Sequence, residues 1–300
     1  MRKFSTLLKA GAAAGALALT MAVAPGAGAA PSDRAVEMHQ ATTSESQRQQ
    51  IRNYWTPARM EAAIPRGQGQ NGHEVAKGKP GGGGGAAAAV KVAETPEFGK
   101  VFFTLGGTNY VCSGTATQSS NADVVTTAGH CLNEGPGAYA TNFIFVPAYA
   151  NGSAPYGEWV AENLVTTTQW RTAGDFNHDV GFAVMAEQGG QSLTQVTGSY
   201  PIAFNLGYNL AFEAYGYPAA RPYDGQGLWK CSGTAGVDTR GTTDHRLPCS
   251  MTGGSSGGGW ITGGALNSVN SFGYRGEKDV MYGPYFGSVE QGVYGTAATS

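Results

Sequence analysis

The sequence predicts an all-β barrel or sandwich, and three observations support this. From Lys91 onward, runs rich in β-branched and aromatic residues recur at intervals of about ten residues. Gly, Asn, Pro and Asp separate these runs, and the 300-residue chain holds 47 Gly but only 13% charged residues. Helical patterns are sparse, confined to residues 54–65 and 285–295. This spacing argues against alternating β–α–β units.

Nine strands are expected along this part of the chain. Each is a short apolar run that ends at a turn-forming residue. The expected strands cover residues 100–105, 110–117, 123–128, 142–149, 179–185, 210–218, 227–234, 258–263 and 266–274.

The first thirty residues have the composition of a secretory signal peptide. A basic start, an Ala-rich apolar run and a small-residue region follow one another. They predict a secreted, extracellular protein. Residues 31–92 are polar and end in a Gly-rich linker, so we expect a propeptide there, with a disordered tail as the alternative.

Charge and hydropathy narrow the range of partners. Residues 1–100 hold 12 Lys and Arg against 7 Asp and Glu, whereas residues 101–300 hold 7 against 14. An acidic body gives no reason to expect nucleic-acid binding, although a basic leader could dock on it. No later apolar run is long enough to predict a membrane span.

The four cysteines predict two disulfides, because an even number in a secreted chain is typical of such bonds. None of them shows the C-x-x-C spacing of a zinc site. The stretch "DFNHD" begins like a calcium loop, but Val180 and Ala186 stand where that loop needs Gly and Glu. No metal site is expected, and whether calcium binds elsewhere is left open.

Three stretches hold the residue types that serine-based hydrolysis requires. A Ser nucleophile needs a His base, the base needs a carboxylate, and the developing oxyanion needs backbone N–H groups in a turn without obstructing side chains. His130 ends the run "DVVTTAGH", and Asp179 opens the apolar "VGFAVM", with Asp175 as a competitor. Ser255 and Ser256 lie between glycines in "GGSSGGG".

In this order, "TAGHC", "HDVGFAVM" and "GSSGGG" resemble the secreted trypsin-like serine peptidases of the chymotrypsin fold, over residues 95–300. The resemblance implies two antiparallel six-stranded β-barrels, about 93–192 and 193–300, packed with the active site in the cleft between them. It implies His130, Asp179 and Ser256 as the catalytic residues, with the amides of Gly254 and Ser256 as the oxyanion hole. It also implies the disulfides Cys112–Cys131 and Cys231–Cys249.

One position departs from the family motif G-D-S-G-G. Ser255 replaces the Asp that, in many animal members, pairs with a new N-terminal amine after cleavage at "IVGG", and this chain has no "IVGG". Activation by that route is therefore not expected. The chain is similar instead to bacterial members, including the glutamyl-endopeptidase-like group.

The resemblance also indicates the substrate pocket. Its members would be Ser250, Met251, Asn270, Ser271, Phe272 and Gly273. Ser250 stands where members that cleave after Arg or Lys carry Asp, so a basic P1 residue would lack its counter-charge. No His lies in residues 246–300 to bind a glutamate, although Asn270, Thr252 or His245 could contribute. Met251 and Phe272 favour an apolar or medium-sized P1 residue.

These observations predict a serine endopeptidase that acts through an acyl-enzyme. We expect a monomer that binds a peptide or protein substrate and its own propeptide, without a cofactor. Three alternatives stay open: a glutamyl-specific endopeptidase, an esterase with the same triad, and a non-catalytic secreted binding protein of the same fold.

Overall fold

The computed structural model describes Met1, residues 36–66 and residues 88–300. The predicted signal peptide and most of the predicted Gly-rich linker lie outside these residues. The segments 36–66 and 88–300 belong to one compact unit, Asp33–Ser300. Within the described residues, no helix is long and apolar enough to cross a membrane.

Six antiparallel strands of the first half close into a barrel, as the sequence predicts. They are β4 (Phe98–Leu105), β5 (Thr108–Thr117), β6 (Val124–Thr127), β7 (Thr141–Pro147), β8 (Trp159–Thr167) and β9 (Gly181–Met185). The order β7-β4-β5-β6-β9-β8 is closed by pairing of β8 with β7. Register shifts in β4 and β8 bend these strands around the barrel. Side chains such as Val101, Val125, Phe145 and Leu164 fill the interior and are completely buried.

The second half is built from two sheets joined on both sides. One sheet has the order β15 (Ala265–Val269), β14 (Gly259–Thr262), β10 (Ala211–Gly216), β11 (Trp229–Thr234) and β3 (Val90–Lys91); the other has β12 (Gly236–Val237), β13 (His245–Pro248) and β16 (Val280–Gly283). The Cys231–Cys249 disulfide connects β11 to the end of β13. On the opposite side, the backbone of Tyr282 in β16 bonds to Ser271 and Phe272, just after β15. Together the two sheets enclose a second core around Trp260.

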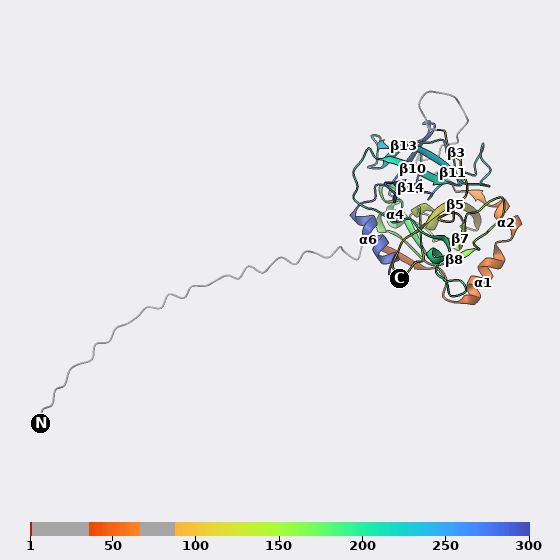
Figure 1. Ribbon diagram of the computed structural model, residues 1–300, viewed down its shortest axis with the longest axis horizontal. Helices are drawn as coiled ribbons and strands as arrows, with labels where there is room; N and C mark the ends of the chain where they lie inside the picture. Colours follow the sequence, from red (N-terminus) through yellow and green to blue (C-terminus); the bar gives the residue numbers. More distant parts are fainter. Residues whose placement is uncertain (2–35, 67–87) are drawn as a thin grey trace. The chain divides into compact units, whose positions relative to one another are not determined.

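Residues 36–66 pack on the first barrel. Strand β1 (Val36–Gln40) pairs antiparallel with β8, and β2 (Ile64–Pro65) pairs parallel with β5. Between them lie α1 (Glu45–Tyr54) and α2 (Pro57–Ala62), drawn in orange in Figure 1 beside the strands of this barrel. The helical pattern predicted over 54–65 is only partly confirmed: α2 forms within it, α1 lies upstream and shares only Tyr54 with it, and residues 64 and 65 form β2. A short break separates the two helices. The break falls at Trp55 and Thr56, because Pro57 cannot donate a helical hydrogen bond and instead begins α2.

Short helices complete the fold. They are α3 (Gly129–Leu132), α4 (Thr168–Ala173), the 3₁₀ turn η2 (Phe176–His178), α5 (Leu193–Thr197) and α6 (Ser288–Ala297). Helix α6 contains most of the second helical pattern predicted, and it packs on β8 and β9. Both α3 and η2 lie at ends of barrel strands, so their side chains have fixed positions.

Candidate active site

His130 lies in α3, a single turn that follows β6. Its backbone N–H donates to Asp179 Oδ1 at 2.8 Å, and its ring Nδ1 lies 2.8 Å from Asp179 Oδ2. Both side chains are completely buried. Because a carboxylate only accepts, Nδ1 carries the proton of this bond, which leaves a lone pair on Nε2 of the neutral ring. In the described part of the chain, Nε2 has no hydrogen-bond partner.

Asp179, rather than Asp175, is the carboxylate that meets this histidine. Asp179 follows η2 and directly precedes the β9 region, as the sequence predicts. Its Oδ2 accepts a further hydrogen bond of 2.5 Å from Ser271 Oγ. Asp175 instead caps η2, where its Oδ1 accepts from the backbone N–H of Asn177 at 3.0 Å. The competitor therefore has a local structural role.

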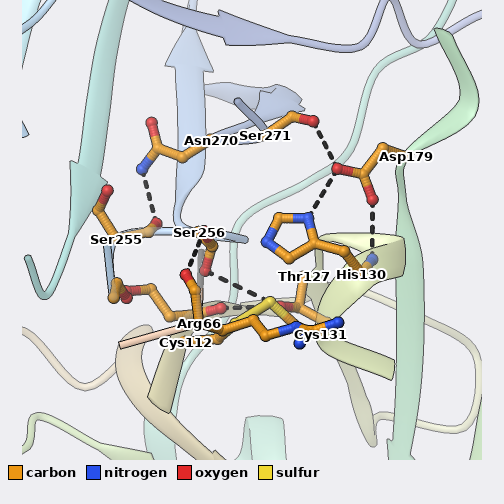
Figure 2. The surroundings of a disulfide bond; sticks show 12 residues. Arg66, Cys112, Thr127, His130, Cys131, Asp179, Ser255, Ser256, Asn270 and Ser271 are labelled. Atoms are coloured by element: carbon orange, nitrogen blue, oxygen red, sulfur yellow. Dashed lines mark hydrogen bonds and ion pairs between the residues drawn. A yellow bond between two sulfur atoms is a disulfide. The ribbon is translucent and has the colours of Figure 1, made fainter. Parts of the chain in front are cut away.

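The two adjacent serines differ in their surroundings. Ser255 Oγ donates to Thr252 O at 2.7 Å inside the turn. Ser256 Oγ has a single described contact, a weak one of 3.5 Å to the carbonyl oxygen of Arg66. In Figure 2 the free edge of the His130 imidazole faces the side on which Ser256 lies. The geometry thus leaves Ser256, and not Ser255, with a hydroxyl available to a base.

The Gly-rich turn around these serines is held on several sides. Gly254 and Gly257 have φ of +97° and +79°, a backbone conformation that residues with a Cβ rarely adopt. The Ser113 backbone N–H donates to Ser256 O at 2.7 Å, and Ser113 Oγ donates to Gly254 O at 2.9 Å. Ser113 directly follows Cys112, whose disulfide to Cys131 lies beside His130 (Figure 2). This corner of the first barrel therefore contacts both the histidine and the serine turn.

The backbone N–H groups of Gly254 and Ser256, the predicted oxyanion hole, donate to no acceptor within the described residues. Ser256 is only 2% exposed. A buried N–H without a partner is costly, by about 1–3 kcal/mol, so such groups are suited to binding an anionic ligand.

Four of the predicted pocket residues have side chains that are bonded or packed within the fold. Ser250 Oγ accepts from the backbone N–H of Ala89 at 2.9 Å and lies 3.0 Å from the Tyr223 hydroxyl, and Met251 is buried in the second core. Asn270 and Ser271 were expected to line the pocket, but the structure uses both side chains internally. The Asn270 amide bonds to two carbonyls and to an indole, and Ser271 bonds to Asp179.

The remaining pocket positions are also buried. Phe272 stacks on Tyr282 with ring centroids 5.0 Å apart, and Gly273 is buried next to it. His245, considered as a further contributor, lies 5.1 Å from the ring of Phe212, and burial lowers its pKa to about 4. A histidine this hard to protonate is neutral at neutral pH.

A metal centre is not supported by the donor atoms present. Among the described residues, only Cys112, His130 and Cys131 bring three candidate ligand atoms together, within 4.8 Å of one another. Both sulfurs belong to a disulfide and therefore cannot act as thiolate ligands.

Sequence reasoning missed three participants in this site. Ser113 bonds to Gly254, which lies 141 positions away in the sequence. Ser271 bonds to Asp179, which lies 92 positions away. No local pattern indicates either contact. The Arg66 carbonyl reaches Ser256 across 190 positions. A helical pattern in the predicted propeptide was the one available signal that this segment folds.

Comparison with known proteins finds similar solved structures, among them proteases. No protein-family model matches the chain, and no curated protein does. The protease Anisep from Arthrobacter nicotinovorans is 52% identical, with a TM-score of 0.69 and coverage of 71% of this chain and all of Anisep. The thermostable serine protease AL20 from an extremophilic microorganism is 48% identical, with a TM-score of 0.68 and coverage of 70% of this chain and all of AL20.

A more distant structure shares only the fold. A Glu endopeptidase is 17% identical, with a TM-score of 0.59, over 72% of this chain and 99% of its own. With half of its residues identical over the full length of a solved protease, and with a serine turn beside a His–Asp pair, the chain belongs to the trypsin-like serine proteases of the chymotrypsin fold.

Proposed function

We propose that this protein is a secreted endopeptidase that cleaves peptide bonds with Ser256, His130 and Asp179. His130 Nε2 takes the Ser256 hydroxyl proton as Oγ attacks the substrate carbonyl carbon. The amides of Gly254 and Ser256 bind the resulting oxyanion. His130 then gives the proton to the leaving amine as the C–N bond breaks, and a water molecule releases the acyl group by the same steps in reverse.

One observation carries this proposal: Asp179 binds His130 at two points. The bond to the backbone N–H fixes the position of α3, and the bond to Nδ1 fixes the tautomer that exposes a basic Nε2. The same carboxylate stabilises the imidazolium that forms when Ser256 loses its proton. Ser271 further holds Oδ2 in place.

We also propose that residues 31–92 are a propeptide whose segment 36–66 closes the site, whereas its last residues pair with β11 as β3. The Arg66 carbonyl lies at Ser256 Oγ, while the two hole amides have no described acceptor. A scissile carbonyl would have to direct its oxygen into that hole, so Arg66 blocks the nucleophile without being presented for cleavage. The buried Trp55 and the pairing of β2 with β5 support this docking.

The alternative of glutamate specificity gains no support from the described residues. The Asn270 amide, the candidate group for a P1 carboxylate, is fully engaged. His245 is buried among aromatic rings with a pKa of about 4, so it offers no positive charge at neutral pH.

Two neighbouring serine variants test the proposed function. In the secreted, processed protein, Ser256→Ala should abolish fluorophosphonate labelling and reduce peptide turnover to about 10³–10⁴-fold over the uncatalysed rate. Ser255→Ala, the matched control, should keep most activity because its hydroxyl only closes the turn. Equal losses in both variants, or turnover by Ser256→Ala above that residual rate, would overturn the assignment. Parallel assays on protein and ester substrates separate an endopeptidase from an esterase.

A further inference from the structure

Asn270 has a completely buried side-chain amide that joins the serine turn to β10 and β14 of the second half. Its Nδ2 donates to Tyr215 O at 2.8 Å and to Ser255 O at 2.9 Å, and its Oδ1 accepts from Trp260 Nε1 at 2.7 Å. Indole Nε1 can only donate, so it must face the amide oxygen. This bond therefore identifies the amide oxygen, and the two carbonyls, which can only accept, hold Nδ2 on their side independently of the indole.

The bond to Ser255 O determines where the next backbone N–H points. The carbonyl of Ser255 and the N–H of Ser256 belong to one planar trans peptide, so they point in opposite directions. With the carbonyl held on Asn270, the Ser256 N–H must point away from Asn270. This is one of the two amides that have no acceptor within the described residues.

The Gly254 N–H, the second amide of the predicted oxyanion hole, is also oriented through the carbonyl of its own peptide, but here the donors to that carbonyl are backbone N–H groups. The carbonyl of Gly253 accepts from the N–H groups of Ala219 and Ala220 at 2.7 and 3.0 Å, so the Gly254 N–H points to the opposite side. A Cβ at Gly254 would lie 2.8 Å from Ala219 Cβ, so this peptide fits tightly against that loop. Of the two peptides, only the Ser255–Ser256 peptide is held by a side chain and can be released by substitution.

We propose that Asn270 is a positioning residue that holds the oxyanion hole open by fixing the Ser255–Ser256 peptide. The proposal rests on the proposed function, and it accounts for the Ser at position 255. The Ser255 hydroxyl bonds within the turn to Thr252 O, so it supplies no charge for an ion pair. A neutral amide directly after β15 orients the turn instead. The hole is consequently already formed while residues 36–66 are docked, and it requires no new N-terminal amine.

Two substitutions at Asn270 test this role in the secreted, processed protein. Asn270→Asp keeps the shape but places an acceptor against two carbonyls, and Asn270→Ala removes the donor. We expect kcat to fall about 10²–10³-fold, the effect of losing one oxyanion donor, with KM changed by only a few-fold. Affinity for a peptide boronic acid, which places an anionic oxygen in the hole, should fall in parallel with kcat/KM.

Trp260→Phe is the matched control. It removes the partner on the other side of the same amide and disturbs the same core, but it leaves Nδ2 on Ser255 O. It should lower Tm while keeping kcat within a few-fold of the parent protein. If folded Asn270 variants keep full kcat, or if all three variants lose kcat in proportion to Tm, Asn270 has no positioning role.

A crystal structure of the unsubstituted enzyme with the boronic acid provides a test that does not depend on variant folding. The Ser256 N–H should donate to a boronate oxygen while Asn270 Nδ2 stays on Ser255 O; a Ser255 carbonyl rotated off Asn270 would refute the proposal. Turnover by Ser256→Ala above its expected residual rate would instead remove the proposed function itself, so the two failures are distinguishable.

Discussion

Gly129 shows how a single position in "TAGHC" allows the His–Asp pair to form. A Cβ there would lie 2.8 Å from the ring of Trp170 and 3.1 Å from Asp179 Oδ1. A side chain at this position would push α3 away from the carboxylate that its next residue, His130, must reach. The glycine is therefore required by the close approach of Trp170 and Asp179 and not by an unusual φ.

Asp179→Asn tests the function of the carboxylate itself. The substitution keeps the size of the side chain, but an amide cannot accept from His130 N–H, His130 Nδ1 and Ser271 Oγ together. The imidazole then adopts the wrong tautomer, and kcat should fall by about 10⁴-fold. Steady-state kinetics with active-site titration measure this, with Asp175→Asn as the control that should lose little. A mild loss for Asp179→Asn would show that another carboxylate orients the histidine.

The residues of the site were predictable to different degrees. His130, Asp179 and Ser256 occur in short motifs whose chemistry is readable locally, and the structure places all three at one corner. The partners of Asn270 and Ser271 were not predictable, because they come from strands that meet only after folding. Position alone suggested that these residues line a pocket, whereas hydrogen-bond satisfaction directs their side chains inward.

At the level of elements, η2 and α6 are linked through a partly buried His–Glu pair. His178, the last residue of η2, places Nδ1 at 2.6 Å from Glu290 Oε1, and Glu290 is 2% exposed. Glu290 Oε2 also accepts from Gly287 N–H at the start of α6. The C-terminal helix is thus joined to the turn that directly precedes Asp179.

This pair predicts a pH-dependent stability. The hydrogen bond to Glu290 raises the pKa of His178 above its usual 6.5. Because the folded state binds this proton more tightly, the stabilisation is complete below pH 6.5 and is lost as pH rises through the raised pKa. The Tm of the parent protein should exceed that of His178→Gln at pH 6, and this difference should shrink by about 2–4 °C between pH 6 and pH 9. Thermal unfolding at several pH values measures this, and a difference independent of pH would contradict it.

Strands were predictable where apolar residues run without interruption. Strand β8 was not expected, because Glu162 and Asn163 interrupt its pattern at the point where the register with β9 shifts. Strands β13 and β16 were not expected either; each has four residues, and β13 consists of His, Arg, Leu and Pro, which form no apolar run. Closure of the first barrel depends on β8, so the sequence predicted the class of fold more securely than its pairing.

For the molecule as a whole, both disulfides have the predicted pairing. They join residues 19 and 18 positions apart, and each such loop contributes about 3 kcal/mol in the chain-entropy description. The predicted electrostatic docking of the leader is a minor part of what the structure shows. Arg48 pairs with Glu162 at 2.7 Å, but β1, β2 and the buried Trp55 form the main contacts. A surface ion pair of this kind contributes at most about 1 kcal/mol.

Trp55 is therefore the residue on which closure of the site should depend. It is 2% exposed, its ring packs 5.5 Å from Phe102, and its Nε1 donates to Asn142 O at 2.6 Å. Truncation of a buried Trp costs about 3–5 kcal/mol, and 3 kcal/mol corresponds to about 100-fold in an opening equilibrium. In the unprocessed chain, Trp55→Ala should increase the rate of fluorophosphonate labelling at Ser256 by about that factor, measured on the full-length band of a gel.

Met38→Ala is the matched control for this last variant, because Met38 lies in β1 of the same segment but is 55% exposed. It should label as slowly as the parent chain. If the parent full-length chain already labels as fast as the processed protein, the Arg66 carbonyl does not block Ser256. If Trp55→Ala labels no faster than Met38→Ala, the segment is held at the site by β2 and its pairing with β5, and packing of α1 on the first barrel makes no contribution.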